Sequence, residues 1–265
     1  PAITTAADLK DFLVNKARFP LFGKPQDFSG SFGSALISAI EGDALVLGNG
    51  RRVNLDAFCQ EIVGDYASGY IFQTALSQHA DMSSVTGDAV GSIRIATVRQ
   101  DVMPEVLYSS WKIPAPKAMS DNFWQDGSMI APVDITTGQV GQCRIGTGLN
   151  ARNIDTHPVS GKAITGMQLP CWDEACTMAR EVHAMLPEFG VIGWDIAVSP
   201  EGPLIIECNT NPIHTLYQLA HCRGIYNDDF TPVFDRVAAR SKQMLDDKMD
   251  KMKKRGKELR RRKKS

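Results

Sequence analysis

Apolar residues that recur three and four positions apart predict three helices in the body of the chain. Leu9, Phe12 and Leu13 share one helical face, and a capping-box variant made by Thr5 and Asp8 can begin that helix. Asn54 can cap a second helix that continues to about residue 66. Residues 172–186 predict the third helix, whose apolar stripe comprises Ala175, Met178, Ala179, Val182 and Met185/Leu186.

Runs rich in β-branched and aromatic residues predict strands between these helices. The runs are 20–25, 35–40, 44–47, 51–53, 70–76, 92–98, 191–199 and 203–209. Asn49-Gly50 marks a two-residue hairpin turn, and residues 100–170, rich in Pro, Gly, Ser and Thr, predict strands joined by long loops. Because helices and hairpins mix without a regular β–α–β rhythm, the sequence predicts an α+β fold.

The hairpin predicted at residues 193–209 places oxygen-bearing side chains on one face. If residues 200–202 form a three-residue loop, Ser199 faces Pro203 and Asp195 lies directly opposite Glu207. Side chains alternate between the faces of a strand, so Asp195, Glu207 and Asn209 share one face. The other face is apolar and is expected in the core, with Trp194, Ile196, Val198, Leu204, Ile206 and Cys208.

Two carboxylates that face each other across a strand pair destabilise it by about 0.2–1 kcal/mol. A divalent cation would offset this repulsion, and carboxylate and amide oxygens are ligands that Mg²⁺ and Mn²⁺ accept. Asp195, Glu207 and Asn209 are therefore candidate metal ligands. The alternative is a solvated polar face with a capping Asn209.

A candidate phosphate-binding loop follows Lys24, which ends a short predicted strand. The small residues of this loop are Ser29, Gly30, Ser31, Gly33 and Ser34. Glycines let backbone N–H groups approach phosphate oxygens, serine hydroxyls add donors, and a lysine adds positive charge. The segment has no GKS or GKT sequence of the Walker A type, so a flexible surface loop is the alternative.

Charge is distributed unevenly, although the formal net charge of the 265 residues is only -1. Residues 236–265 contain 14 Lys or Arg and four Asp or Glu, a net of +10, so the preceding 235 residues carry a net of −11. An acidic body is therefore joined to a basic tail.

The tail predicts a helix that Thr231 and Pro232 begin and that Gly256 alone interrupts. Its apolar positions form a short heptad seam, Leu245, Met249, Met252, Gly256 and Leu259. Such a helix can contact an anionic partner, a membrane surface or the acidic body, and a solvated helix is the alternative. Tail charge alone does not indicate nucleic-acid binding, and we do not expect a nucleic-acid partner.

Cysteine usage and hydropathy favour a cytoplasmic protein. The six cysteines form no CxxC pair and no zinc-site spacing, which favours reduced thiols. No run approaches 18 apolar residues, so no transmembrane segment is predicted, and no secretory signal is present.

Four segments, in this order, resemble the ATP-grasp enzymes, and most closely the sugar-transfer-associated ATP-grasp group. They are Lys24 with its small-residue loop, segment 70–76 (YIFQTAL), segment 92–97 (SIRIAT) and the hairpin that carries Asp195, Glu207 and Asn209. Segments 155–161 (DTHPVSG) and 193–197 (GWDIA) support the resemblance, which covers roughly residues 8–222.

The resemblance implies an ATP-grasp fold, in which two α+β subdomains clasp ATP. It places a small subdomain with the phosphate loop and hinge at residues 1–78, a larger subdomain with the metal site at 79–228, and a basic helical tail at 229–265. The domain that normally precedes the nucleotide-binding half is expected to be absent from this chain.

The resemblance also implies a role for each matching residue. Lys24 resembles the lysine that holds the α and β phosphates, and residues 30–34 resemble the loop that closes over the triphosphate. The adenine-contacting hinge would be Gln73, Thr74, Ala75 and Leu76, with Gln73 in place of a commonly acidic residue.

Arg94 resembles a basic residue that reaches the γ-phosphate or the developing acyl phosphate, although its place between Ile93 and Ile95 also fits a surface strand arginine. Asp195, Glu207 and Asn209 resemble the ligands of Mg²⁺ or Mn²⁺.

The activity implied is that of an ATP- and Mg²⁺-dependent ligase. Such an enzyme activates a small-molecule carboxylate as an acyl phosphate and joins it to an amine, here on a sugar or a cell-surface polysaccharide precursor. One alternative is a kinase that phosphorylates a hydroxyl of a sugar or polyol with the same ATP site. Another is a non-catalytic binding module that uses the basic tail.

Overall fold

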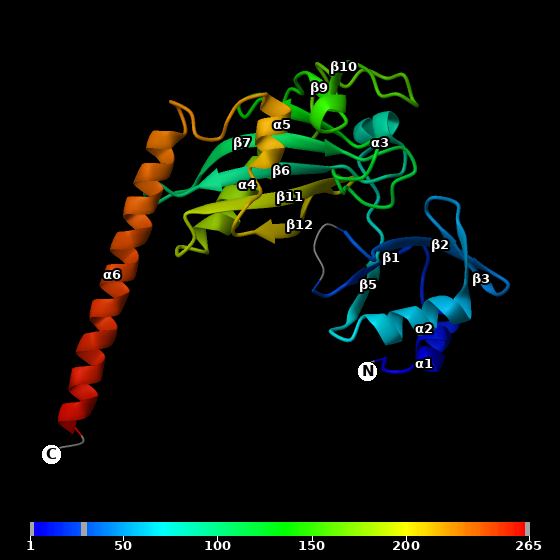
Figure 1. Ribbon diagram of the computed structural model, residues 1–265, viewed down its shortest axis with the longest axis horizontal. Coiled ribbons are helices and arrows are strands. Elements are labelled where there is room, and N and C mark those ends of the chain that lie inside the picture. The colour runs from blue at the N-terminus through cyan, green and yellow to red at the C-terminus, as the bar shows by residue number, and fades with distance from the viewer. Residues whose placement is uncertain (1–2, 28–30, 263–265) are drawn as a thin grey trace.

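Two antiparallel sheets with helices packed against them form the protein (Figure 1). The computed structural model describes residues 3–27 and 31–262, with side chains described up to residue 255. Every strand pair is antiparallel, and the helices are separate elements beside the sheets. The α+β class predicted from the sequence is therefore confirmed.

The smaller sheet has five strands in the order β4-β3-β2-β1-β5. Its strands are β1 (Leu21–Pro25), β2 (Ala35–Glu41), β3 (Ala44–Leu47), β4 (Arg52–Asn54) and β5 (Tyr70–Thr74). Helices α1 (Ala6–Asn15) and α2 (Leu55–Asp65) cover one of its faces (Figure 1). Their shared core contains Leu9, Leu13, Leu21, Ile37, Leu45, Leu55 and Phe58.

Both helices begin where the sequence predicted. The Thr5 side chain accepts a hydrogen bond from the backbone N–H of Asp8, and the Asn54 side chain accepts one from Ala57. Each cap satisfies a backbone donor that the first helical turn leaves without a partner. The helices are thus fixed in length by their capping residues and in orientation by their apolar faces.

The larger sheet has seven strands in the order β10-β9-β8-β7-β6-β11-β12. Its strands are β6 (Ser92–Val98), β7 (Glu105–Ile113), β8 (Met129–Val133), β9 (Cys143–Ile145), β10 (Arg152–Ile154), β11 (Val191–Ser199) and β12 (Gly202–Asn209). Between β5 and β6 lies α3 (Ala80–Thr86), and a short 3₁₀ turn, η1 (Gly148–Asn150), precedes β10.

Helices pack on both faces of the larger sheet. One face packs against α4 (Trp172–Ala184) in a core that contains Ile93, Ile95, Trp111, Trp194 and Ala179. The opposite face packs against α5 (Thr215–His221) and the start of α6 (Thr231–Arg262) through Ala96, Tyr108, Tyr217, Phe234 and Val237. Charged residues of this second face that no helix covers remain free to line a site.

The apolar stripe predicted for α4 is correct except at its end. Of the two residues predicted at that end, Leu186 packs against the core, whereas Met185, one residue after the helix ends at Ala184, is 77% exposed. His183 is fully buried instead, between Thr97 (Oγ1 to Nδ1, 2.7 Å) and the carbonyl of Phe189 (Nε2 to O, 3.0 Å). A buried histidine with a partner at each ring nitrogen completes the stripe that apolar periodicity assigned to methionine.

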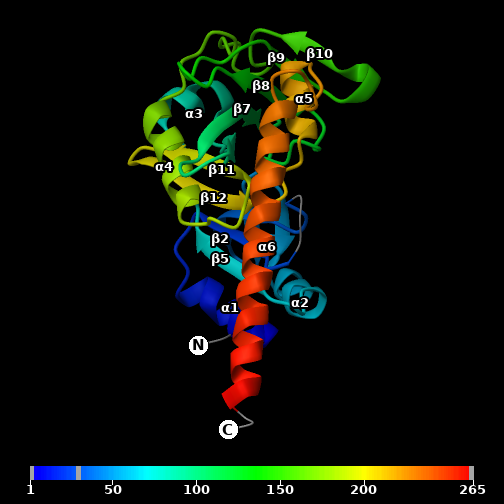
Figure 2. The same ribbon diagram turned by 90° about the vertical axis from the view of Figure 1, so that its left-hand side faces the viewer.

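Helix α6 projects from the larger sheet at the end away from the smaller sheet, as Figures 1 and 2 show. It begins at Thr231 itself, because Thr231 N–H already bonds the carbonyl of Asn227. The predicted interruption at Gly256 is wrong, since the helix continues to Arg262; an isolated glycine costs a helix only about 1 kcal/mol.

Among the described residues, no helix is long and apolar enough to cross a membrane.

Candidate functional site

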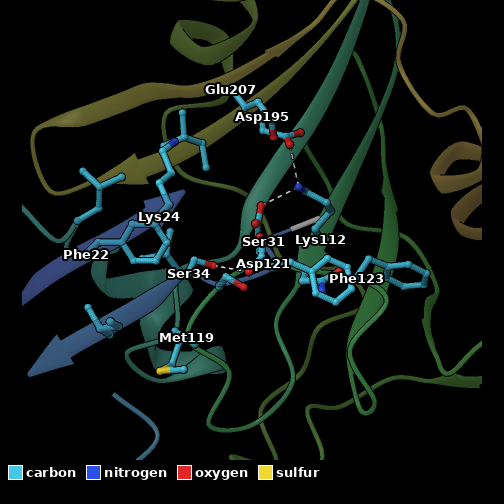
Figure 3. Close-up of a pocket in the computed structure, with 18 of the residues that line it drawn as sticks. Phe22, Lys24, Ser31, Ser34, Lys112, Met119, Asp121, Phe123, Asp195 and Glu207 are labelled. Carbon is cyan, nitrogen blue, oxygen red and sulfur yellow. Dashed lines mark hydrogen bonds and ion pairs between the residues drawn. The ribbon is translucent and has the colours of Figure 1, made fainter. Parts of the chain in front are cut away.

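A cleft of about 320 Å³ is lined by residues from both sheets and from the loop between β7 and β8. The smaller sheet contributes Phe22, Lys24, Leu36 and Gln73, and the larger sheet contributes Arg94, Lys112, Asp195, Ile206, Glu207 and Asn209. Figure 3 shows Phe22 and Lys24 on one side of the cleft and Lys112, Asp121 and Phe123 on the other. A cavity of this size, with apolar walls and a few convergent charged groups, is typical of a small-molecule site.

The hairpin β11–β12 places Asp195 directly opposite Glu207, as predicted, although its loop is shorter than predicted. Ser199 pairs with Gly202 rather than Pro203, so only two residues form the loop. Gly202 adopts φ +122, a conformation that glycine tolerates. The Ser199 hydroxyl also donates to the Gly202 carbonyl (3.0 Å), which helps to close the shorter loop.

A β-bulge between Asp195 and Ile196 restores the register that the shorter loop would shift. Ile196 pairs with Ile205 and Asp195 pairs with Glu207, which leaves Ile206 as the extra residue of β12. The core partner on β12 is therefore Ile205, and the prediction that Ile206 lies in the core is wrong. Ile206 lines the cleft beside Glu207 instead.

The predicted apolar face is also partly wrong on β12, the outer strand of this hairpin. β12 is an edge strand, with a neighbour on one side only. Leu204 and Cys208 are exposed for this reason, whereas Trp194, Ile196 and Val198 on β11 are buried. The expectation of a core cysteine at position 208 is therefore wrong.

Asp195 is buried and forms ion pairs with two basic side chains. Arg94, its cross-strand neighbour on β6, donates from Nε to Oδ1 (2.5 Å) and from Nη2 to Oδ2 (3.0 Å). Lys112 on β7 donates from Nζ to Oδ2 at 2.9 Å. Side chains that point to the same face of three adjacent strands thus form one charged cluster.

The cluster extends from the sheet into the loop between β7 and β8. Nζ of Lys112 lies 2.6 Å from Oδ2 of Asp121 (Figure 3). The hydroxyl of Ser92 also donates to Asp121. Lys112 therefore bridges two carboxylates, one on the sheet and one on the loop. This bridge holds the loop against the cleft.

The pKa values of the two hairpin carboxylates, Asp195 and Glu207, are shifted in opposite directions. Burial alone would raise the pKa of Asp195, but Lys112 and Arg94 hold it below its ordinary value, so Asp195 is ionised. Glu207 is exposed to the cleft, but the cleft walls partly remove it from water and Asp195 adds negative charge. The pKa of Glu207 consequently lies above its ordinary value. A cation bound beside Glu207 would relieve this repulsion.

Two polar atoms of cleft residues are buried and have no hydrogen-bond partner among the described residues. They are Nη1 of Arg94 and Nδ2 of Asn209. Buried donors of this kind usually have partners, so each marks a place where a bound group could accept a hydrogen bond. Both belong to residues that the sequence singled out.

The small-residue loop is only partly described, and Ser29 and Gly30 lie outside the described residues. Lys24, Ser31 and Ser34 line the cleft, as does Phe32, whose side chain is 71% exposed. Gly33 has φ +73, and its carbonyl accepts a hydrogen bond from the Tyr70 hydroxyl at 2.8 Å. Gly33 therefore shapes the turn, while its neighbours face the cleft.

The predicted hinge lies at the end of β5, where the chain leaves the smaller sheet. Gln73, Ala75 and Leu76 line the cleft. Thr74 does not line it, and its side chain is exposed, because successive side chains of a strand point to opposite faces.

Two residues of the cleft, Lys112 and Asp121, were not predicted as site residues. Lys112 lies between Trp111 and Ile113 as Arg94 lies between Ile93 and Ile95, but Lys112 lies outside the segments that carry the family resemblance. No sequence pattern identified Asp121, because it lies in a long loop whose position depends on contacts with distant segments.

The three predicted metal ligands all line the cleft, but they are not equally available. Both oxygens of Asp195 are bound by Arg94 or Lys112. Glu207 and Asn209 form no such ion pair among the described residues. Within the described residues, no three His, Cys, Asp or Glu side chains form a metal-sized cluster. A hard cation here would therefore need other oxygen donors beside the carboxylates, and the Asn209 amide oxygen is one.

Comparison with known proteins gives matches among solved structures and one matching family. D-alanine–D-alanine ligase from Bacillus anthracis is similar over 91% of this chain and 59% of that chain, with 14% identity and a TM-score of 0.43. The chain thus spans 59% of the length of that ligase. No curated protein matches the chain.

The family comparison covers most of the chain, including both sheets and the cleft. Residues 16–231 match the model of a family described as sugar-transfer associated ATP-grasp. The matched segment begins before β1 and ends where α6 begins. The protein therefore belongs to the sugar-transfer-associated ATP-grasp family.

Proposed function

We propose that the protein is an ATP- and Mg²⁺-dependent ligase that activates a carboxylate as an acyl phosphate and joins it to an amine. The observation that carries this proposal is the cleft, where Lys24, Arg94 and Lys112 converge with Glu207 and Asn209 in a chain of the ATP-grasp family. Three basic side chains in one cleft suit a polyanionic substrate such as a nucleoside triphosphate.

The apolar part of the cleft suits the adenine base. Phe22, Leu36 and Ile206 offer apolar surface, and Gln73 with Ala75 and Leu76 supplies polar side-chain and backbone groups at the end of β5. A flat heterocycle held between such walls would place its phosphates toward Lys24 and the serines at positions 31 and 34. We extend this assignment to Ser29 and Gly30 from the sequence alone.

The residues present fit a magnesium ion in donor type. Glu207 supplies a carboxylate, and Asn209 supplies an amide whose Nδ2 makes no hydrogen bond. Asp195 would complete the set by sharing an oxygen now bound by Arg94 or Lys112. When bound, the cation would neutralise phosphate charge during phosphoryl transfer.

The chain's own residues would then position and neutralise the reacting groups. Lys24 contributes positive charge from β1, and Lys112 contributes it from β7. Arg94 is fixed by Asp195 and keeps Nη1 for a phosphate or acyl-phosphate oxygen. Preorganised donors of this kind stabilise developing charge without having to reorganise during the reaction.

The proposed reaction has two steps. A carboxylate oxygen attacks the γ-phosphorus, and the bond to the β-phosphate oxygen breaks with release of ADP. The amine then attacks the acyl carbon, a C–N bond forms, and inorganic phosphate leaves with the electron pair of the C–O bond. We propose that the acceptor is a sugar or a cell-surface polysaccharide precursor, which the family description supports.

Replacement of Glu207 tests the site. Glu207→Gln removes the charge of a proposed ligand and should lower Mg²⁺-dependent ATP turnover on the order of 100-fold or more. Glu201→Gln makes the same change at the tip of the same hairpin, outside the cleft, and should leave turnover unchanged. Unchanged turnover in Glu207→Gln would contradict the proposal.

The reaction type is tested by product analysis. Purified protein, ATP and Mg²⁺ are incubated with pairs of carboxylic acids and amines, and the products are weighed by mass spectrometry. A ligase yields an amide together with ADP and free phosphate. A product that carries the phosphate would instead identify a kinase for a sugar or polyol hydroxyl.

A further inference from the structure

The proximal turns of α6 pack against the body, and its distal part does not. Val233, Phe234 and Val237 belong to the core on one face of the larger sheet. Arg236 donates to Gln100 (2.6 Å), and Arg240 donates to the carbonyl of Pro187 (3.3 Å). Beyond position 241, the hydrogen bonds and ion pairs of the described side chains stay within the helix. Figure 1 shows this part of the helix extending away from the two sheets.

The apolar stripe of α6 continues past the region that packs on the body. Leu245, Met249 and Met252 follow at i, i+4 and i+7, so they share one face. They are 59%, 46% and 62% exposed. An apolar stripe that leaves the protein core and remains exposed is a candidate interaction surface.

The same part of the helix is strongly basic, and the charge rises along it. Residues 242–255 contain six Lys or Arg and three Asp, and residues 256–265 of the sequence add six Lys or Arg and a single Glu. The three acidic residues of the first stretch lie at 246, 247 and 250. Positive charge is therefore concentrated distal to the acidic residues, around and beyond Met252.

We propose that the distal part of α6, residues 242–262, binds an anionic membrane surface as an in-plane amphipathic helix. Leu245, Met249 and Met252 would enter the boundary between headgroups and acyl chains. The lysines and arginines would contact acidic headgroups. Each such residue would raise the membrane partition coefficient of the protein several-fold. The inference does not depend on the reaction catalysed in the cleft.

Charge and exposure together favour an anionic membrane over a second copy of the chain, a nucleic acid or an acidic protein face. Pairing the helix with a second copy would bring two tails of +10 each side by side, which their repulsion opposes. Nucleic acid or an acidic protein face would use the charge but leave Leu245, Met249 and Met252 without a role. A bilayer with acidic lipids satisfies both features.

The geometry also leaves the cleft open. α6 leaves the larger sheet at the end away from the smaller sheet, and the cleft lies between the two sheets (Figure 1). A helix held in the plane of a membrane would therefore tether the body without covering the entrance to the cleft.

The charge requirement is tested by co-sedimentation of the full chain with lipid vesicles. We expect binding to phosphatidylcholine vesicles that contain about 30% phosphatidylserine, and at least tenfold weaker partitioning to pure phosphatidylcholine. The quadruple variant Lys251→Gln, Lys253→Gln, Lys254→Gln, Arg255→Gln should lower partitioning at least tenfold. The matched control, Arg18→Gln, Lys117→Gln, Arg152→Gln, Lys162→Gln, removes the same charge from exposed sites on the body and should bind as the parent does.

The apolar requirement is tested separately. Leu245→Gln, Met249→Gln, Met252→Gln keeps the charge and the helix propensity, and should weaken binding to acidic vesicles several-fold. Its control, Val102→Gln, Met103→Gln, Met185→Gln, removes exposed apolar side chains from the body and should have no effect. Circular dichroism checks that helix content is unchanged in both.

Three results would overturn the proposal. One is equal partitioning to neutral and acidic vesicles. Another is retention of full vesicle binding by the charge variant or by the apolar variant. The third is no vesicle binding together with salt-sensitive self-association or binding to a duplex DNA probe, either of which assigns the helix to a different partner.

Discussion

Asp195 is the residue around which the cleft is organised. It is 2% exposed, and Arg94 and Lys112 reach it from two other strands. A buried carboxylate costs several kcal/mol of desolvation unless cations and hydrogen bonds offset it. Asp195 therefore fixes the two basic side chains in place, and they in turn keep it ionised.

Removal of Lys112 should cost stability as well as activity. Lys112→Met leaves Asp121 without its ion-pair partner and removes one of the two cations from the buried Asp195. We expect a loss of about 3–5 kcal/mol in the free energy of unfolding, measured by urea denaturation.

A second variant separates the loss of stability from the loss of activity. Lys112→Met combined with Asp121→Asn removes the charge that Lys112→Met leaves without its ion-pair partner, and it keeps the Arg94–Asp195 pair, so it should regain part of the stability. It should remain inactive in Mg²⁺-dependent ATP turnover. A double variant no more stable than Lys112→Met would show that the pair does not interact as described.

At the scale of elements, the hairpin β11–β12 and the strand β6 form the floor of the cleft. Gly193 on β11 lies between Asn209 on β12 and Ala96 on β6. A Cβ atom there would lie 2.7 Å from Cβ of Pro212 and 3.3 Å from Cδ of Arg94. This close approach brings the segment after β12 onto Arg94, so the glycine sets the position of a cleft residue.

Gly193→Ala should therefore disturb the cleft. We expect a loss of about 1–3 kcal/mol in unfolding free energy, because Pro212 or Arg94 must move. ATP turnover should fall with it. Gly64→Ala in α2 is the matched control: nothing lies within 4 Å of its added Cβ, and alanine should stabilise the helix by up to about 1 kcal/mol. Equal stability of Gly193→Ala and the parent would contradict this packing argument.

At the scale of the whole molecule, the two sheets form the cleft and α6 extends from the body. Val237 is 6% exposed in the core of the larger sheet, whereas Leu245, Met249 and Met252 on the same helix are 46–62% exposed. Only the proximal turns of α6 therefore contribute to the stability of the body.

Two truncations test this division. Removal of residues 242–265 should change the free energy of unfolding by no more than about 0.5 kcal/mol. Removal of residues 236–265 also deletes Val237 and should lower the free energy of unfolding by about 1.5–3 kcal/mol. Urea denaturation measures both. A large loss in the shorter truncation would show that the distal helix packs on the body.

Local chemistry in the sequence predicted most elements and part of the cleft. Caps at Thr5 and Asn54 placed two helices, because a capping side chain needs only the backbone N–H groups of the next turn. Strand alternation placed Asp195, Glu207 and Asn209 on one face, because it depends only on a period of two, whereas Arg94 was identified by the family resemblance. The predicted loop was one residue too long, and the bulge compensated for that error by chance.

The tertiary structure decided what those residues contact. Arg94 and Asp195 are 101 positions apart, and Lys112 and Asp195 are 83 positions apart, so no local pattern connects them. The order of the strands in the larger sheet brings the three side chains onto one face, and the helices on that face leave them uncovered. The sequence by itself determined the helices, the strands and the alternation of side chains, because those depend on near neighbours. The ion pairs of Asp195 and the position of Asp121 depend on packing between distant segments, and only the folded chain determines them.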